Sequence, residues 1–574
     1  MKTWHQVSPN IFCPILFAAF FLSLATLTHG QVTVVVDGNT TYQTIRGWGG
    51  NAYSWVVNGW NGWTNNQVFN IAFNKLGTTH VRVVTEFERW EPVNDDDDPS
   101  HFNWSYYQSR FDGADISSRL VQGDFNMMDK VVNDFRDHLI IGIWDVPNWM
   151  VEDSTKIDHR NLPYRMHREF AESVAAYLLW ARDRRGIKID GIAIANEPDG
   201  HNVKYSPAEL RDLIKTVGAK FTREGIRTKI IAPDLSSPYY DPDKWVAPLL
   251  ADSVAASYLG AISYHTYYTS GSPDQWNKKF ARIAQLAASK NLPVYFTEIG
   301  TTPFGIPNTT WPWAFDCMQM WHNALTHGNA NLAFQWTLLG KDQALDPDTT
   351  RNHIFFAIKQ FFSHIRADAV RIAVSSTNNN LLASAFKHTG SNRAQIVLIN
   401  RSLLSQKVTI KLRNLDVSTF AACRTSATEK HKTLGDAAVL SNEINITIPA
   451  NAIETLDGAI TPSLNLILET RDATLSPAAF NLQAYPNPFH TATQIQFVLP
   501  QAAEVKMAIL DLDGREVQEL ITASFAAGEH VVAWDRKNRT GSKLSSGIYF
   551  VRLRYRAAQT NAWSQAVQRI IMLN

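Results

Sequence analysis

The sequence predicts an α/β fold, a (β/α)8 TIM barrel followed by two all-β sandwich domains. Three observations lead to this fold class. The chain has 574 residues, which is too long for a single hydrophobic core. Between Arg46 and Arg366, short apolar runs alternate eight times with stretches whose apolar residues recur at helical spacing. After Arg366 the apolar residues recur with a period of two, which is typical of β-strands joined by polar turns.

Eight short apolar runs are the predicted strands of the barrel. Their hydrophobic residues follow one another without alternation, as in parallel strands that are buried on both faces. The predicted strands span residues 45–51, 79–85, 139–145, 190–196, 229–234, 261–266, 293–297 and 330–337. The clearest predicted helices span residues 166–185, 207–225, 274–290 and 313–327. Ser206 followed by Pro207 is a typical start of a helix.

An open, doubly wound sheet is the alternative arrangement of alternating strands and helices. That fold requires a glycine-rich phosphate-binding loop between an early strand and a helix. Residues 46–51, Arg-Gly-Trp-Gly-Gly-Asn, are rich in glycine, but no helix begins directly after them and no Gly-Lys-Ser/Thr follows. The closed barrel is therefore the preferred interpretation.

The rest of the chain divides into two predicted β-domains. Residues 367–458 predict a β-sandwich with strands at 370–374, 381–386, 395–400, 407–412 and 444–448. The barrel domain is expected to span residues 31–366, although residues 31–44 contain an extended segment that could join the sandwich instead. A linker is expected at 459–480. Short strands and turn residues over 481–574 predict a C-terminal immunoglobulin-like domain.

Residues 1–30 resemble a secretory signal peptide. Lys2 supplies a positive charge, residues 11–27 are apolar, and the small residue Gly30 ends the segment before Gln31. An uncleaved membrane anchor is the alternative, but Pro14 and the modest apolar length favour cleavage. No later segment is long and apolar enough to span a bilayer. The chain is therefore expected to be secreted or displayed at the cell surface, with no membrane span after signal removal.

The charge balance limits the class of partner. Lys and Arg number 54 against 53 Asp and Glu, so the net charge is +1, and neither nucleic acid nor an anionic membrane is indicated as a partner. The 18 tryptophans are more unusual. Indole rings stack on the apolar faces of sugars, although they also fill cores. Six of them near predicted strand ends are candidate sugar platforms: Trp55, Trp60, Trp144, Trp149, Trp311 and Trp313.

Cofactor and metal chemistry is not indicated by the sequence. Cys13 lies in the signal segment, while Cys317 and Cys423 fall in different predicted domains, so no disulfide framework is expected. The 17 histidines show no metal-binding spacing. The acidic run Asp95–Asp98 could hold calcium, but a solvated loop is the preferred interpretation. We therefore expect neither a catalytic metal nor a cofactor.

Two glutamates follow predicted strands about a hundred residues apart. Glu197 ends Gly-Ile-Ala-Ile-Ala-Asn-Glu at 191–197, and Glu298 follows Leu-Pro-Val-Tyr-Phe-Thr at 292–297. These are the fourth and seventh predicted strands, whose carboxyl ends face each other across the mouth of a barrel. Either glutamate alone fits an ordinary loop or helix start. Together they predict a pair of carboxylates about 5 to 5.5 Å apart, the arrangement that hydrolyses glycosidic bonds with retention.

The barrel resembles clan A of the glycoside hydrolases. In that clan the fourth-strand Asn-Glu carries the acid/base and the seventh-strand glutamate is the nucleophile, which implies these roles for Glu197 and Glu298. Asn196 would contact a sugar hydroxyl. Arg82 stands where a second-strand arginine holds the nucleophile and keeps it ionised.

Other positions extend the resemblance. His265 and Tyr267 resemble the sixth-strand His-x-Tyr pair, whose tyrosine hydrogen-bonds the nucleophile. Trp336 resembles the eighth-strand tryptophan beneath the sugar that is cleaved. Within the clan, residues 46–51, the third-strand segment around Trp144 and the appended sandwich are most similar to family 30, with family 5 as the alternative.

The C-terminal region resembles the sorting domain of the type IX secretion system. The resemblance rests on Tyr-Pro-Asn-Pro-Phe at 485–489, Asp-Leu-Asp-Gly-Arg-Glu-Val at 511–517, residues 528–535 and Ser-Gly-Ile-Tyr-Phe-Val at 546–551. It implies secretion machinery as a partner. Immunoglobulin-like domains of filament scaffolds share some of these pieces, and a passive spacer or glycan-binding sandwich is the alternative.

These features together predict a secreted retaining endo-β-glycosidase acting on a β-linked polysaccharide, with xylan or a β-glucan as the preferred substrate. An exo-acting β-glucosidase or β-xylosidase, or a glucosylceramidase-like enzyme, is the alternative reaction. A non-catalytic carbohydrate-binding surface protein is the alternative of another class. The sugar and its linkage depend on loops whose conformation the sequence does not give.

Overall fold

The computed structural model describes residues 31–53, 66–135, 138–156, 160–267, 273–300, 309–340, 343–346, 348–461, 481–499, 501–511, 514–557 and 563–573. The chain divides into two compact units, residues 1–464 and 465–574. The predicted signal peptide, most of the predicted linker, Trp55 and Trp60 lie outside the described residues.

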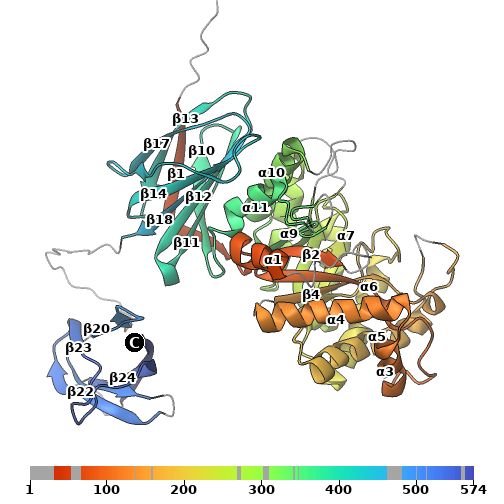
Figure 1. Cartoon of the computed structure of the whole chain (residues 1–574), viewed down its shortest axis with the longest axis horizontal. Helices are drawn as coiled ribbons and strands as arrows, with labels where there is room; N and C mark the ends of the chain where they lie inside the picture. Colours follow the sequence, from red (N-terminus) through yellow and green to blue (C-terminus); the bar gives the residue numbers. More distant parts are fainter. Residues whose placement is uncertain are drawn as a thin grey trace, which may run out of the picture. The chain divides into compact units, whose positions relative to one another are not determined.

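Eight parallel strands close into a barrel in chain order, which confirms the predicted fold class (Figure 1). The strands are β2 (Gly47–Tyr53), β3 (His80–Glu86), β4 (His138–Asp145), β5 (Gly191–Ala193), β6 (Lys229–Leu235), β7 (Leu259–His265), β8 (Val294–Ile299) and β9 (Ala330–Gln335). Each strand overlaps one of the predicted ones. β5 is shorter than expected, because its strand pairing stops at Ala193 and the chain bends before Asn196.

Helices surround the barrel (Figure 1). They are α1 (Asn66–Phe69), α2 (Phe87–Trp90), α3 (Trp104–Asp112), α4 (Ile116–Asp134), α5 (His167–Leu179), α6 (Pro207–Arg223), α7 (Pro242–Ala251), α8 (Ser253–Tyr258), α9 (Asn277–Ala288), α10 (Trp311–Thr326) and α11 (His353–Phe362). α1 and α5 continue as π-helical turns at Asn70–Leu76 and Trp180–Arg184. The predicted start of α6 is present, with Ser206 and Glu209 forming a reciprocal capping box.

Large and small side chains fill the barrel interior together. A buried cluster inside the barrel consists of Ile140, Ala193, Ile231, Ala261, Tyr295, Leu332 and Phe334. Gly49 is required beside it, since a Cβ there would meet the Phe334 ring at 2.1 Å. Trp48 points away from this interior and is 1% exposed, with its Nε1 donating to the Ile365 carbonyl at 2.6 Å. The glycine-rich segment 46–51 therefore serves close packing rather than phosphate binding.

The first β-domain contains a ten-stranded sheet in the order β15-β14-β18-β12-β11-β10-β1-β13-β17, with β16 pairing β14. Its strands are β1 (Val32–Thr44), β10 (Val370–Ser376), β11 (Leu381–His388), β12 (Arg393–Asn400), β13 (Gln406–Arg413), β14 (Val417–Thr425), β15 (Lys432–Thr433), β16 (Ala437–Ala438), β17 (Glu443–Ile448) and β18 (Ala452–Ile460). β1 lies between β10 and β13, so the segment before the barrel is part of this sheet. β14 and β18 were not predicted.

The barrel and this sheet share one compact unit. The last barrel helix, α11, packs against β14 and β18: Gln360 Nε2 donates to Thr425 Oγ1 at 2.8 Å, and Thr455 Oγ1 donates to the Gln360 carbonyl at 3.0 Å. Ile399 and Ile453 of the sheet belong to the same buried apolar cluster as the barrel helices. The junction between barrel and sheet is therefore a packed interface.

The C-terminal unit consists of two sheets, β19-β20-β23 and β22-β21-β24-β25. Its strands are β19 (Asn481–Tyr485), β20 (Thr493–Leu499), β21 (Ala503–Leu510), β22 (Glu516–Phe525), β23 (Gly528–Trp534), β24 (Gly547–Ala557) and β25 (Ser564–Met572). Trp534 and Phe489 belong to its buried core. Across the ranges that the structure describes, no helix combines the length and apolarity needed to cross a membrane.

Candidate active site

The two glutamates meet at the carboxyl ends of the barrel strands. Glu298 lies in β8, and Glu197 lies in the turn after β5. Their residues are 1% and 5% exposed. Glu197 adopts a left-handed backbone with φ of 48°, and its N–H donates to the Asp234 carbonyl at 3.0 Å. A non-glycine residue in this conformation carries strain, which the surrounding structure must support.

His265, at the end of β7, lies between the two carboxylates. Its Nδ1 is 2.7 Å from Glu197 Oε1 and 3.6 Å from Glu298 Oε2. One ligating atom from each of these three side chains lies within 4.8 Å of the other two. The structure therefore places the predicted pair face to face, with an imidazole spanning the gap.

Arg82 of β3 connects the glutamate of β8 to three other strands or strand ends. Its Nη1 donates to Glu298 Oε1 at 2.5 Å and to Asn51 Oδ1 at 2.9 Å. Its Nη2 donates to Asn196 Oδ1 at 2.7 Å and to Asp234 Oδ2 at 2.9 Å. The side chain is fully buried. The fork of the guanidinium thus orients four acceptors at once, which a lysine could not do.

Gly142 of β4 makes room for this guanidinium. A Cβ at Gly142 would lie 2.5 Å from Arg82 Nη2 and 2.6 Å from its Cζ. Distances this short require a shift of the buried guanidinium or of the strand. The glycine within the third predicted strand is therefore tied to the position of Arg82.

Tyr267 completes the surroundings of Glu298. Its hydroxyl donates to Glu298 Oε2 at 2.9 Å, so both carboxylate oxygens of Glu298 accept hydrogen bonds. Burial, together with the nearby Glu298 and Glu197, raises the pKa of Tyr267 well above its ordinary value, and the phenol remains a donor. Asn196 uses its side-chain oxygen on Arg82, which leaves its amide nitrogen to face a ligand.

The charges of the site control one another. Burial raises the pKa of Glu298, while the positive charges of His265 and Arg82 oppose that rise. Burial by itself would lower the pKa of His265, but Glu298 and Asp234 raise it to about 10, so this imidazole is a cation at neutral pH. Arg82 acts on Glu298 in the direction expected from the sequence, and His265 adds a second positive charge.

Asp234, at the end of β6, was missed from the sequence. Its Oδ2 accepts from Arg82 and lies 3.5 Å from His265 Nε2, while its Oδ1 accepts from Thr297 at 2.5 Å. Burial favours its neutral form, but Arg82 and His265 hold the pKa of Asp234 far below its usual range. The signal was available, because Asp234 ends a predicted strand in the same way as the two glutamates. Asn51 ends the first predicted strand and was missed as well.

The two predicted tryptophans at the barrel mouth lie together. The rings of Trp144 and Trp336 are stacked, with centroids 5.3 Å apart and planes inclined by 20°. Both are half-buried. Each indole thus has one face covered by the other, and the pair forms a single aromatic unit at the carboxyl ends of β4 and β9.

The three other candidate platforms that the structure describes differ in burial, and Trp149 is the half-buried one. Trp311 and Trp313 begin α10 and are 7% and 8% exposed. Trp311 Nε1 donates to the Asn451 carbonyl at 3.1 Å, and Trp149 Nε1 donates to the Glu91 carbonyl at 2.9 Å. The interpretation of Trp311 and Trp313 as sugar platforms was wrong, because both rings are buried; for the half-buried Trp149 it stays a prediction.

The acidic loop Asp95–Asp98 is held by local hydrogen bonds. Asp98 accepts from the Ser100 N–H at 3.0 Å, and Asp96 lies 2.7 Å from His101 Nδ1. Asp95 turns inward and forms a cluster with Glu91 and Glu172, whose carboxylate atoms lie within 4.8 Å of one another. Part of the predicted solvated loop is therefore tied to a buried acidic cluster.

Comparisons with known proteins agree with this architecture. Residues 368–456 match the glycosyl hydrolase family 30 beta sandwich domain, and residues 489–559 match the FlgD Ig-like domain. The chain is 25% identical over 323 residues to glucuronoxylanase XynC of Bacillus subtilis, which covers 54% of this chain and 72% of that protein.

Solved structures share the fold. A family 30 endoxylanase from Clostridium papyrosolvens has a TM-score of 0.59 at 21% identity and covers 74% of this chain and 100% of its own. The subfamily 8 xylanase Xyn30A from Clostridium acetobutylicum has a TM-score of 0.59 at 19% identity, covering 74% of this chain and 99% of its own. Identities this low establish the fold and leave the substrate open.

A closed barrel with two facing glutamates at its carboxyl end, joined to a glycosyl hydrolase sandwich, defines the chain as a glycoside hydrolase. The similarity to family 30 is specific over residues 368–456, where the sandwich model matches. The family model that matches the C-terminal unit is an FlgD Ig-like domain, which the sequence had raised only as a source of shared motifs.

Proposed function

We propose that the protein is a retaining endo-β-xylanase that cleaves the main chain of a xylan-like polysaccharide by double displacement. The observation that carries this proposal is the approach of Glu197 and Glu298, which place one carboxylate oxygen each within 4.8 Å of the other. Retaining enzymes hold their carboxyl groups about 5 to 5.5 Å apart, whereas inverting enzymes need about 6.5 to 9.5 Å to admit a water.

In the first step, Glu298 attacks the anomeric carbon of the bound sugar. A carbon–oxygen bond forms to the carboxylate as the glycosidic carbon–oxygen bond breaks, and protonated Glu197 gives its proton to the leaving oxygen. In the second step, Glu197 takes a proton from a water whose oxygen attacks the same carbon. The bond to Glu298 breaks, and both carboxyl groups return to their starting protonation states.

The neighbouring residues prepare these two roles. Arg82 Nη1 and the Tyr267 hydroxyl hold opposite oxygens of Glu298, which fixes the direction of attack. His265 donates to Glu197 Oε1 at 2.7 Å, so Oε2 is the oxygen left for the leaving group. The Trp144–Trp336 stack offers an apolar surface for a pyranose ring.

Xylan is the substrate that the relatives favour. The names of XynC and of the two solved Clostridium enzymes all describe xylanases. An exo-acting β-xylosidase or β-glucosidase is the competing reaction on the same carboxylates. We expect the purified protein to release a ladder of short oligosaccharides from glucuronoxylan. Release of monosaccharide alone from xylan, or cleavage confined to β-1,3-, β-1,4- or β-1,6-glucans, would replace the xylanase proposal.

Stereochemistry and mutation test the roles of the glutamates. NMR of the first product should show the β-anomer before mutarotation, and an initial α-anomer would rule out double displacement. Glu298→Gln should lower kcat by at least about 10⁴-fold while retaining xylan binding. The matched variant Glu224→Gln, at the end of α6, should keep full activity. If the wild type binds xylan without cleaving it, the protein is a carbohydrate-binding surface protein.

Secretion is proposed on the sequence of both ends. The signal-like segment 1–30 favours export, and the motifs of the C-terminal unit favour a sorting role besides its FlgD Ig-like fold. We expect removal of residues 481–574 to leave the activity of the barrel unchanged and to abolish cell-surface display in a host with type IX secretion. Normal display of the truncated chain would leave the C-terminal unit as a spacer.

A further inference from the structure

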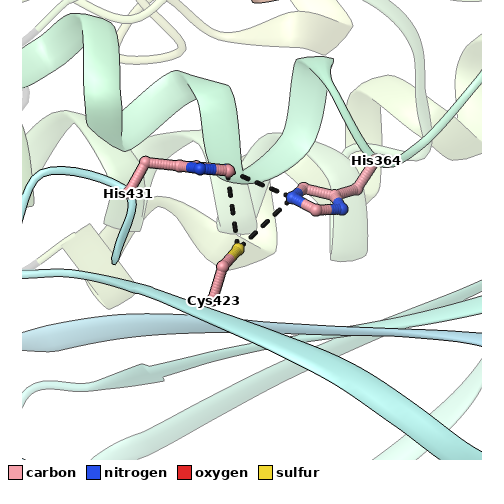
Figure 2. Close-up of side chains that lie close together, drawn as sticks. All are labelled: His364, Cys423 and His431. Carbon is pink, nitrogen blue, oxygen red and sulfur yellow. Dashed lines mark hydrogen bonds between the residues drawn. The ribbon is translucent and has the colours of Figure 1, made fainter. Parts of the chain in front are cut away.

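A second cluster of ligating side chains lies where the barrel meets the sandwich sheet. His364 follows α11, Cys423 is in β14, and His431 precedes β15. Figure 2 shows the two imidazoles and the thiol pointing toward one another from these three segments. The residues are separated by 59 and 8 positions in sequence, so no spacing motif revealed them.

The distances among the three ligating atoms are those of a metal site. His364 Nε2 lies 3.1 Å from His431 Nε2, and Cys423 Sγ lies 3.3 Å and 3.5 Å from these two nitrogens. Tetrahedral zinc, with Zn–N near 2.05 Å and Zn–S near 2.3 Å, separates two nitrogens by about 3.3 Å and a nitrogen from a sulfur by about 3.6 Å. We propose that His364, Cys423 and His431 bind one zinc ion at the barrel–sandwich junction.

The surroundings orient His364 for this role. Its Nδ1 lies 3.3 Å from Asp457 Oδ2, and a carboxylate there selects the tautomer whose Nε2 lone pair faces the cluster. Asp457 is itself held by Arg393 Nε at 2.9 Å and by Gln395 Nε2 at 3.0 Å. A carboxylate, a histidine and a metal position in line are a recurrent arrangement at zinc sites.

His431 is held in place by its backbone. It has φ of 52°, in the left-handed region, and its N–H donates to Thr425 Oγ1 at 3.3 Å. Its ring lies parallel to that of His364, with centroids 5.3 Å apart and planes inclined by 22°. The turn after β14 therefore brings a third ligand over the strand at a cost in backbone strain, which a bound ion would offset.

The hydrogen bonds of the cluster leave its ligating atoms close together. With its Nδ1 proton directed at Asp457, His364 offers a lone pair at Nε2 to His431 Nε2, and the Cys423 thiol donates to Gln360 Oε1 at 3.3 Å. A zinc ion would accept lone pairs from His364 Nε2, His431 Nε2 and Cys423 Sγ in place of these contacts. Binding forms two Zn–N bonds and one Zn–S bond, and the thiol proton leaves to solvent.

The proposed ion would join two parts of the fold. Cys423 is 5% exposed and the histidines are half-buried, and with three protein ligands a water would complete the tetrahedral set. The three ligands come from the end of the last barrel helix and from two neighbouring segments of the sandwich sheet. Zinc would therefore fasten the barrel to the sheet, independently of the carboxylates of the active site.

Metal analysis of the full chain, purified without a polyhistidine tag, tests the proposal. We expect roughly one zinc per chain after dialysis, and a fall in Tm of about 5 °C when a chelator removes it. Cobalt substitution should give tetrahedral d–d bands together with a thiolate-to-cobalt charge-transfer band. Cys423→Ser should abolish the charge-transfer band, and His431→Gln should weaken zinc retention at least about 10-fold.

Matched variants separate the cluster from other thiols and imidazoles. Cys317→Ser, in α10, and His101→Gln, in the acidic loop, should retain zinc and the cobalt spectrum. Absence of zinc from a folded wild type that also fails to take up cobalt would overturn the proposal. An intense visible thiolate-to-copper band with preferential copper retention would overturn the zinc assignment. Full xylan hydrolysis by Cys423→Ser would show that the variant is folded.

Discussion

Two clusters of largely buried ionisable groups in the barrel domain differ in their protonation states. At the strand ends, Arg82 and His265 face Glu197, Asp234 and Glu298, so positive and negative charges compensate each other. Between the end of α2, the acidic loop and α5, the carboxyl groups of Glu91, Asp95 and Glu172 approach one another without a basic partner among the hydrogen bonds that the structure describes for them.

The difference appears in the protonation states. Burial raises the pKa of Glu91 to about 8 and that of Glu172 to about 10, and the Tyr107 hydroxyl lies 3.1 Å from both carboxyl groups. Because these two carboxyl groups remain neutral, they avoid the desolvation penalty of a buried carboxylate. In the active site, by contrast, Asp234 keeps its charge because Arg82 and His265 compensate it. In these two clusters the carboxyl group beside the cations stays ionised, and that cluster is the one to which we assign the proposed chemistry.

Removing the central cation should break the compensated cluster. Arg82→Gln leaves Glu298 and Asp234 buried without their shared donor, so we expect kcat to fall about 10³-fold and the free energy of unfolding to fall by about 3–5 kcal/mol. Xylan hydrolysis and chemical denaturation measure the two effects. Arg110→Gln removes an arginine of a more exposed pair with Asp115 and should change stability by less than about 1 kcal/mol. Equal effects of both variants would contradict the distinction.

Removing the negative charge of Asp234 should lower the pKa of His265 and test how the two groups are coupled. Asp234→Asn keeps the shape of the side chain and deletes a charge that raises the pKa of His265, so that pKa should fall from about 10. We expect kcat/KM to fall about 10- to 100-fold and the alkaline limb of its pH profile to move to lower pH. Asp241→Asn, at the start of α7, should leave the profile unchanged. An unmoved alkaline limb in Asp234→Asn would remove His265 from the pH dependence.

A steric change can displace the cation without deleting it. Gly142→Ala places a methyl group against the Arg82 guanidinium, so we expect a loss of stability of about 2 kcal/mol and about a 10-fold loss of kcat. The control is Gly435→Ala in the sandwich sheet, where a Cβ meets nothing within 4 Å. A fully active Gly142→Ala protein would show that the position of the guanidinium tolerates a shift.

The uncompensated cluster should respond to pH. Because the folded-state pKa of Glu91 lies above its unfolded value of 4.5, its contribution to stability is complete below pH 4.5 and is lost as pH rises toward 8. We expect thermal unfolding to show a loss on the order of 2 kcal/mol between pH 5 and 9. Glu91→Gln should flatten this dependence, and a stability that rises with pH in the wild type but not in the variant would contradict it.

Much of the barrel was predictable because its signals are local. Apolar runs such as 229–234 and the capped start at Ser206 depend on a few neighbouring residues, and they located strands and helices within a few positions. β14 and β18 were not predicted, since their alternation is interrupted by buried polar residues such as Thr455 that bond to α11. Buried polar groups with distant partners look like loop residues in a sequence.

Part of the site was predictable from the order of the strands. Arg82, Glu197 and Glu298 lie on or directly after the second, fourth and seventh barrel strands, so closing the barrel in chain order predicts that they meet at one end. Trp311 and Trp313 were candidates for sugar binding, but they are buried in the first turn of α10, and this burial depends on tertiary packing rather than on position in a strand. Indole chemistry is the same in a core and at a subsite, and only burial separates the two.

The sequence by itself determined the class of fold, the glutamate pair and the arginine beside it, since strand order in a closed parallel barrel follows chain order. The tertiary structure decided what depends on distances between remote segments. These features are the ion pairs of Asp234 with Arg82 and His265, the neutral carboxyl cluster, and the approach of His364, Cys423 and His431 to one another. Electrostatic interaction and metal coordination act over a few ångströms, and only the folded chain sets distances of that size.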